Sequence, residues 1–182
     1  LHAHDPAAGT TRTLMFDQPV VALSLTNRQG RLIVALGSRL ILFNPADGSR
    51  EDLPAALEGW PELRFNDGRS DPRGTFWIGS MGNNVGPNGE GLPVTDGKGT
   101  LYRYRNGGAL EKIETGIGIP NTLCWSPDGR RFYFGDSLKN EIRVYGYDPE
   151  SGDIGPGASC FSGFERGVPD GSAMDSEGFL WN

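Results

Sequence analysis

The sequence lacks long apolar runs: none of its segments approaches eighteen consecutive hydrophobic residues. A helix needs about 20 such residues to cross a bilayer, so we expect no membrane-spanning segment and no membrane partner. Cysteine is equally scarce, with only Cys124 and Cys160 in the chain. Two cysteines are too few for a disulfide framework, and the apolar or small residues around each predict buried or half-buried thiols.

Positive charge is also in short supply. The 17 lysines and arginines are outnumbered by 23 aspartates and glutamates, which gives a net charge of −6. Without a basic stripe the chain lacks the electrostatic surface that binding to nucleic acid requires. No secretory leader is visible at Leu1, and the compartment stays open, with the cytoplasm as our working expectation.

Turn-forming residues, in contrast, are abundant. The chain contains 28 glycines and 13 prolines, while hydrophobic residues make up 36% of it. Such a composition favours many short strands over helices. A length of 182 residues is enough for one domain with a substantial core.

A short turn segment recurs four times along the chain. The copies occupy residues 27–30, 71–74, 126–129 and 175–178, and each ends in glycine. The glycines lie 44, 55 and 49 positions apart, a period of roughly fifty. Periods of about 40 to 50 residues built from strands are typical of the blades of a β-propeller.

Each repeat divides into short β-branched and aromatic runs. The first and third repeats predict four strands each, at residues 20–25, 31–35, 40–43 and 50–53 and at residues 122–126, 131–135, 141–147 and 159–162. The second repeat predicts strands at residues 75–81, 100–104 and 110–114. Four strands form a blade, and the fourth repeat runs from Gly171 to Asn182. We therefore expect residues 1–182 to be a partial all-β propeller domain of about three and a half blades, truncated at both ends.

The repeat also aligns polar side chains. Three of them share one register, eight residues before the turn glycine: Asn66, Asn121 and Asp170. We place this register just before the innermost strand, where blades converge on a central channel, so the three could bind a hard cation or a polar ligand. Asparagine and aspartate before glycine are also ordinary turn residues. That interpretation fits Asn66 and Asp170, but not Asn121, which Thr122 follows.

Three segments carry a family resemblance. Residues 64–81 read RFNDGRSDPRGTFWIGSM, residues 119–129 read IPNTLCWSPDG, and residues 167–182 read GVPDGSAMDSEGFLWN. In this order the chain resembles the senescence marker protein/gluconolactonase/regucalcin family of sugar-lactone lactonohydrolases, and its LWN ending is most similar to bacterial members. The likeness runs from about Val21 to the last residue. It implies a six-bladed β-propeller that holds one divalent cation, calcium or zinc, at one end of its channel.

The resemblance also implies roles for individual residues. The family's metal ligands match Asn121 and Asp170, and its substrate contacts match Arg64 and Asn66. The family's third metal ligand is a glutamate in an early Gly-Glu-Gly-Pro-like segment. No such segment is present in this chain, and Glu90 lies in the wrong repeat to replace that glutamate. A glutamate that some members direct at the sugar falls at Thr95.

The implied activity is hydrolysis of a sugar lactone, a cyclic ester, to its open-chain acid. A cation polarises the carbonyl, Asp170 as general base takes the proton from water, and Arg64 suits the sugar hydroxyls or the ring oxygen. Two alternatives stay open: a calcium-binding regulatory protein on the same scaffold, and a related metal-dependent esterase or organophosphatase. Arg64 is also open to interpretation as a surface charge beside a turn.

Other conspicuous residues have structural interpretations. We expect Asp67 and Asp136 to be turn or strand-end residues that accept hydrogen bonds from backbone amides. The four tryptophans, Trp60, Trp77, Trp125 and Trp181, are expected to pack between blades.

Overall fold

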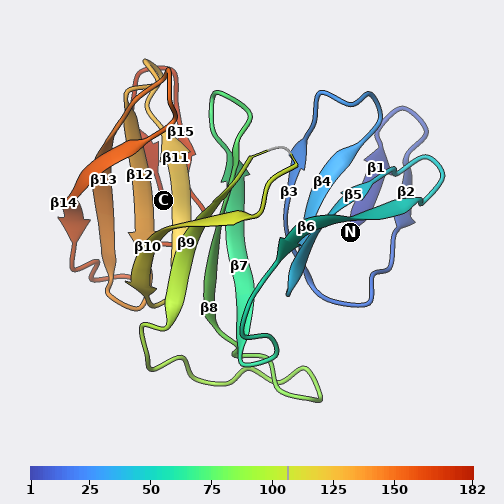
Figure 1. Cartoon of the computed structure of the whole chain (residues 1–182), viewed down its shortest axis with the longest axis horizontal. Helices are drawn as coiled ribbons and strands as arrows, with labels where there is room; N and C mark the ends of the chain where they lie inside the picture. Colours follow the sequence, from blue (N-terminus) through green and yellow to red (C-terminus); the bar gives the residue numbers. More distant parts are fainter. Residues whose placement is uncertain (106) are drawn as a thin grey trace.

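The computed structural model describes residues 1–105 and 107–182, and within them every regular element is a β-strand (Figure 1). The strands form three four-stranded antiparallel sheets and two two-stranded ones. The predicted all-β propeller fold with four-stranded blades is confirmed. No helix long and apolar enough to cross a membrane occurs among these residues.

The strands have the following bounds. The first blade contains β3 (Val20–Leu25), β4 (Leu32–Leu36), β5 (Arg39–Phe43) and β6 (Arg50–Ala56). The second contains β7 (Leu63–Ser70), β8 (Phe76–Gly82), β9 (Gly99–Tyr104) and β10 (Leu110–Ile117). The third contains β11 (Pro120–Trp125), β12 (Arg131–Asp136), β13 (Glu141–Tyr147) and β14 (Ile154–Ser162). The smaller sheets are the hairpins of β1 (His2–Asp5) with β2 (Thr10–Thr13) and β15 (Ala173–Met174) with β16 (Leu180–Trp181).

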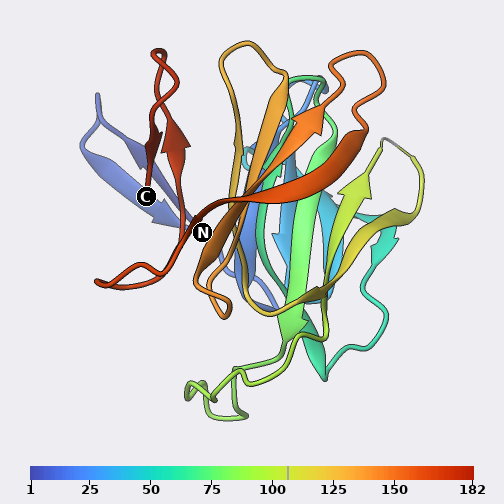
Figure 2. The same cartoon turned by 90° about the vertical axis from the view of Figure 1, so that its left-hand side faces the viewer.

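The blades stand side by side through their first strands. In each blade the strand order follows the chain order, and β3, β7, β11 and β15 are successive neighbours. The hydroxyls of Ser24 on β3 and Ser70 on β7 lie 2.6 Å apart and tie the first two blades together. Figure 2 shows both small hairpins on the same side of the three large sheets. The order of the inner strands matches consecutive propeller blades arranged around an axis that their first strands line.

Two strand regions escaped the sequence-based prediction. β7 carries Arg64, Asn66, Asp67 and Arg69 on eight residues, so it lacks the apolar alternation of a half-buried strand. The hairpin of β1 and β2 is also polar, and most of its residues are exposed. β7 nevertheless forms because β8 supplies a hydrogen-bonding partner and the neighbouring inner strands cover it.

The recurring turn has a specific hydrogen-bonding basis. Asp71 accepts hydrogen bonds at Oδ1 from the amides of Arg73 and Thr75, and at Oδ2 from the indole of Trp77 at 2.9 Å. Asp175 repeats the pattern with the indole of Trp181, also at 2.9 Å. An aspartate that satisfies its own turn and an aromatic side chain on the next strand explains the repeated motif.

Aromatic side chains fill the space between the second and third blades. Trp77 is fully buried, its ring centroid lies 5.1 Å from that of Phe132, and Trp125 stacks on Phe132 at 4.7 Å. The expectation that tryptophans pack between blades is correct for Trp77 and Trp125. Trp60 and Trp181 are 40% and 67% exposed, and for these two residues packing between blades stays a prediction. Both lie outside this aromatic cluster, Trp60 in a connection between blades and Trp181 on a two-stranded hairpin.

Both cysteines are free thiols. Cys124 is buried on β11, as its apolar neighbours predict. Cys160 is exposed, and the expectation of a buried or half-buried thiol is wrong there. The reason is its place on β14, the outer edge strand of the third blade, which has a strand partner on one side only.

Candidate functional site

The inner strands are bulged at the register that the repeat picks out. Pairing of β7 with β8 shifts between Phe65 and Gly68, and pairing of β11 with β12 shifts between Asn121 and Cys124. A bulge adds a residue to one strand and turns nearby side chains in new directions, which is why bulges are common next to binding sites.

The predicted placement of the polar register just before the innermost strands is wrong for two of its three residues. Asn66 and Asn121 lie inside β7 and β11, not before them. The strands continue past these polar residues because the bulge accommodates them without ending the pairing. Asp170 does precede its strand, β15, as predicted.

A chain of hydrogen bonds joins the second and third blades at this register. Nη1 of Arg64 donates to Oδ1 of Asn66 at 2.9 Å. Nδ2 of Asn66 donates to the carbonyl of Pro120 at 3.0 Å and faces Oδ1 of Asn121 at 3.4 Å. Nδ2 of Asn121 donates to the hydroxyl of Ser137 at 2.7 Å. The structure thus brings Arg64, Asn66 and Asn121 together.

Arg64 is held firmly and is not a free surface charge. Nε and Nη2 donate to Oδ1 of Asn84 at 2.9 and 2.7 Å, and Nη1 also donates to the carbonyl of Phe65 at 2.8 Å. With the bond to Asn66, these contacts use four of the five N–H donors of a guanidinium. Burial lowers the pKa of Arg64, and among the described residues it forms no ion pair. One N–H therefore remains for a ligand.

The backbone of Asp170 is docked on β11. Its carbonyl accepts hydrogen bonds from the amide of Thr122 at 3.1 Å and from the Thr122 hydroxyl at 2.8 Å. The preceding carbonyl, that of Pro169, accepts a short hydrogen bond from the Ser137 hydroxyl. Asp170 itself is exposed. These contacts place Asp170 beside β11, the strand that carries Asn121.

Thr122 adopts a backbone conformation that is unusual for its residue type. Its φ is 53°, in the left-handed region, which β-branched residues rarely occupy. The residue is fully buried, and its hydroxyl also contacts that of Ser172 at 2.9 Å. Such a conformation persists only where surrounding contacts hold it, and it is often found at functional sites.

Asp67 lies in a different place from the one expected. It sits within β7, in the bulge, although it does bond the amide of Gly68 at 2.8 Å. Burial raises the pKa of the Asp67 carboxyl, and the negative charge of Asp170 adds to this, while the Gly68 amide and Arg69 act in the opposite direction. A second carboxyl therefore lies within electrostatic reach of Asp170.

Asp136, in contrast, matches its expectation. It ends β12, and its carboxylate accepts hydrogen bonds from the amides of Gly118 at 2.9 Å and Ile119 at 3.0 Å. Asp136 is therefore a strand-end residue that satisfies the backbone of the preceding turn.

Two residues of the site, Ser137 and Asn84, escaped the sequence analysis. The β11–β12 hairpin folds about Gly129, and Ser137 lies eight residues after that glycine as Asn121 lies eight before it. A count in both directions would have found Ser137. Asn84 lies in the connection between β8 and β9 and carries no comparable signal.

The donors present suit a hard cation. No group of three or more His, Cys, Asp or Glu side chains that could hold a metal occurs in the described part of the chain. The two predicted ligands are instead a mixed set, the amide of Asn121 and the carboxylate of Asp170, whose backbone carbonyl is docked on the residue after Asn121. Oδ1 of Asn121 belongs to a residue that is 6% exposed, and its contact with Asn66 is long, at 3.4 Å. A buried oxygen with one weak donor fits a cation ligand.

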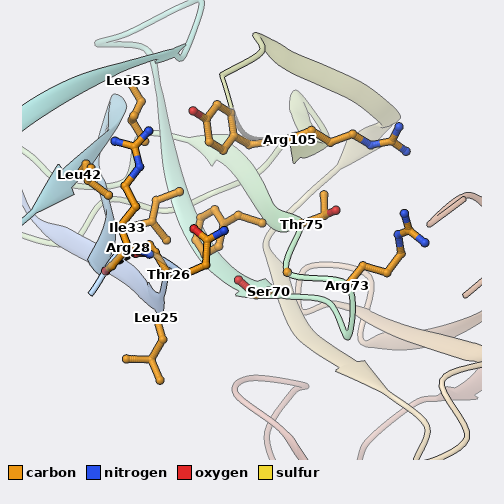
Figure 3. Close-up of a pocket in the computed structure, with 14 residues that line it drawn as sticks. Leu25, Thr26, Arg28, Ile33, Leu42, Leu53, Ser70, Arg73, Thr75 and Arg105 are labelled. Atoms are coloured by element: carbon orange, nitrogen blue, oxygen red, sulfur yellow. Dashed lines mark hydrogen bonds between the residues drawn. The ribbon is translucent and has the colours of Figure 1, made fainter. Parts of the chain in front are cut away.

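A cavity of about 410 Å³ lies elsewhere, between the first two blades (Figure 3). Ser70, at the far end of β7 from Arg64, lines it together with apolar side chains such as Leu25. Arg73 and Arg105 point away from it in Figure 3 and donate to backbone carbonyls in the turn between β13 and β14. None of the residues predicted for the functional site lines this cavity.

The fold and the polar register together define a β-propeller protein with an oxygen-rich site on its inner strands. The family model described as "SMP-30/Gluconolactonase/LRE-like region" matches residues 1–182, and the chain belongs to this family.

Named relatives agree with this assignment. Pentonolactonase XacC of Haloferax volcanii is 30% identical over 183 residues, which cover 100% of this chain and 58% of that protein. Regucalcin of Gallus gallus is 29% identical over 178 residues, 97% of this chain and 58% of that protein. The crystal structure of regucalcin from Agrobacterium tumefaciens, a calcium-binding protein, matches with a TM-score of 0.86 and 31% identity, covering 100% of this chain and 58% of that one. The chain thus spans less than two thirds of the length of these relatives.

Proposed function

We propose that the protein hydrolyses a sugar lactone to the open-chain sugar acid, with one divalent cation held by Asn121 and Asp170. The observation that carries this proposal is the hydrogen-bond chain from Arg64 through Asn66 to Asn121, beside the docked Asp170 backbone. These hydrogen bonds place the guanidinium of Arg64 near Oδ1 of Asn121, the oxygen proposed to bind the cation. The proposed hydrolysis uses both groups, the guanidinium for the sugar and the oxygen for the cation. The family membership and the name of the pentonolactonase relative support the same reaction.

A bound cation supplies polarisation of the lactone carbonyl and stabilises the negative charge that develops on its oxygen. Oxygen donors without nitrogen or sulfur favour calcium over zinc. Asp170 accepts the proton of the attacking water, whose oxygen adds to the carbonyl carbon. The ring C–O bond then breaks, and the proton passes to the ring oxygen, which becomes a hydroxyl.

Arg64 and Asn66 orient the sugar. The remaining N–H of Arg64 donates to a sugar or ring oxygen, and the four bonds that hold the guanidinium keep that donor in place. A donor fixed before the substrate arrives loses little entropy when it binds. Five- and six-carbon aldonolactones are the substrate class that we propose.

The test is a panel of aldonolactones, simple esters and an organophosphate, assayed with chelator and with added calcium or zinc. We expect acid release from a lactone that stops with chelator and returns with calcium. Faster turnover of the esters or the organophosphate would favour those substrates instead.

A second candidate function is calcium binding without catalysis, and the regucalcin relatives favour it. It predicts calcium binding but no turnover of any member of the panel. The bonds that hold Arg64 argue for the enzyme, because an ion-binding regulator needs no fixed donor for a substrate.

A further inference from the structure

The hydrogen bonds that link Arg64 to the Pro169 carbonyl all have the same donor-to-acceptor direction. The chain starts at Arg64, whose guanidinium only donates, and ends at the Pro169 carbonyl, which only accepts. Asn66, Asn121 and Ser137 stand between these ends. Because both ends are fixed in character, every group between them has a defined donor side and acceptor side.

Ser137 sets the orientation of the Asn121 amide. A hydroxyl has one proton, and that of Ser137 goes to the Pro169 carbonyl. Toward Asn121 the hydroxyl can therefore only accept, and the group at 2.7 Å must be the amide nitrogen. Oδ1 of Asn121 is thereby turned away from Ser137 and toward Asn66.

The flipped orientation would be penalised on both sides. Oδ1 of Asn121 would then face the Ser137 oxygen, so the hydroxyl would have to give up the Pro169 carbonyl. Nδ2 of Asn121 would face Nδ2 of Asn66, which already donates to the Pro120 carbonyl. Ser137 and Asn121 are 7% and 6% exposed, so water offers little compensation for a lost partner.

We propose that Ser137 is a positioning residue that holds the Asn121 amide with its oxygen toward the cation. This inference rests on the proposed function for the cation, while the orientation itself follows from the hydrogen bonds alone. The same hydroxyl anchors the Pro169 carbonyl, one residue before Asp170, so it couples the two proposed ligands. Ser137 contacts neither substrate nor cation in this role.

The test compares Ser137→Ala with Ser137→Thr, which keeps the hydroxyl, and with Ser80→Ala. Ser80 is a matched control: it is fully buried, and its hydroxyl accepts a hydrogen bond from the Thr100 amide of β9 at 3.1 Å and takes no part in the hydrogen bonds that link Arg64 to Pro169. Two readouts are followed by NMR on ¹⁵N-labelled protein. One is the hydrogen exchange of the Asn121 side-chain amide without metal, and the other is the midpoint of a calcium titration.

We expect Ser137→Ala to speed exchange of the Asn121 side-chain amide and to raise the calcium midpoint about 10- to 100-fold, the usual effect of removing a group that orients a ligand. Ser137→Thr should restore both readouts, and Ser80→Ala should lower the melting temperature while leaving both unchanged. Unchanged exchange and midpoint in Ser137→Ala would overturn the proposal, as would an equal effect of Ser80→Ala. If the wild-type spectrum does not change on addition of calcium, the proposed metal site is wrong. The hydrogen exchange of the Asn121 side-chain amide then still decides the role of Ser137.

Discussion

The hydroxyl of Tyr147 donates a 2.7 Å hydrogen bond to Oδ2 of Asp71, and so ties the third blade to the turn of the second. Trp77 donates to the same oxygen from within the second blade. The carboxylate that shapes the repeated turn is therefore also a contact between blades. Both partners are buried, with Tyr147 4% and Asp71 5% exposed.

Replacing Tyr147 with phenylalanine should lower the free energy of unfolding by about 1.5–3 kcal/mol, the range for a hydrogen bond to a charged group. The ring stays, so the loss reports the hydroxyl alone. Urea unfolding of wild type and variant at neutral pH measures it. A change close to zero would mean that Asp71 is satisfied without Tyr147.

Alkaline pH should destabilise the fold. Burial raises the pKa of Tyr145 and Tyr147, and hydrogen bonds to Glu114 and Asp71 raise it further. Above about pH 10 the unfolded chain releases these phenol protons while the folded chain keeps them, so the unfolded state binds fewer protons. The free energy of unfolding should therefore be fully retained below pH 10 and fall above it. Unfolding at stepped pH should show a shallower fall when both tyrosines are phenylalanine, and an identical slope would contradict the assignment.

Changing Asp170 to asparagine should reduce turnover about 10²- to 10⁴-fold, the usual contribution of a general base. Asparagine keeps the volume and one ligating oxygen but cannot accept the proton. The assay must be made at saturating calcium, so that weaker metal binding does not add to the loss. Turnover near the wild-type rate would leave Asp170 as a ligand at most, and Asp67 would be the next carboxylate to examine.

Arg64→Lys should lower kcat/KM for the lactone about 10- to 100-fold. Lysine keeps the charge but has no planar fork, so it cannot clasp Asn84 and orient Asn66 at once. A lost hydrogen bond to a charged group costs about 1.5–3 kcal/mol, which corresponds to this range. The exposed Arg105→Lys is the control and should leave kinetics unchanged. Equal kinetics for both variants would mean that Arg64 serves the structure only.

Thr122→Val should destabilise the protein by about 1–3 kcal/mol, whereas Thr122→Ser should retain most of the stability. Valine keeps the shape and the β-branch, so the backbone strain at φ 53° is the same and only the hydroxyl is lost. The Asp170 carbonyl and the Ser172 hydroxyl then lose a buried partner. Thermal unfolding of both variants measures the difference. Equal stability of the two would show that the hydroxyl does not anchor Asp170.

Much of the fold could be predicted from the sequence because turns and apolar runs are local signals. The predicted strands at residues 20–25 and 141–147 coincide with β3 and β13. β7 could not be found in this way, because its polar side chains serve the site and hide the strand pattern. An inner strand that carries chemistry loses the hydrophobic alternation by which strands are recognised.

The site was predictable only in part. The period of the repeat singled out Asn66, Asn121 and Asp170, because equivalent positions of consecutive blades lie close in space. The structure places Asn66 against Asn121 and the Asp170 backbone against Thr122, while their roles in a site stay a prediction. It could not find Asn84, whose position depends on a connection outside the repeating unit. Nor could it show which way the Asn121 amide faces, because that depends on a hydroxyl sixteen residues away along the chain.

The bulges of the inner strands separate architecture from chemistry. Asn66 and Asp67 lie between the paired residues Phe65 and Gly68, so their side chains can change without disturbing the ladder. At the equivalent register of the first blade, next to a similar bulge in β3, stands Ala22. Consecutive blades thus present equivalent side-chain positions around one axis, and these positions can be substituted without changing the strand pairing. Each of these positions can carry a polar side chain or a small apolar one. New specificities can therefore arise on this scaffold through a few substitutions that leave the blades unchanged.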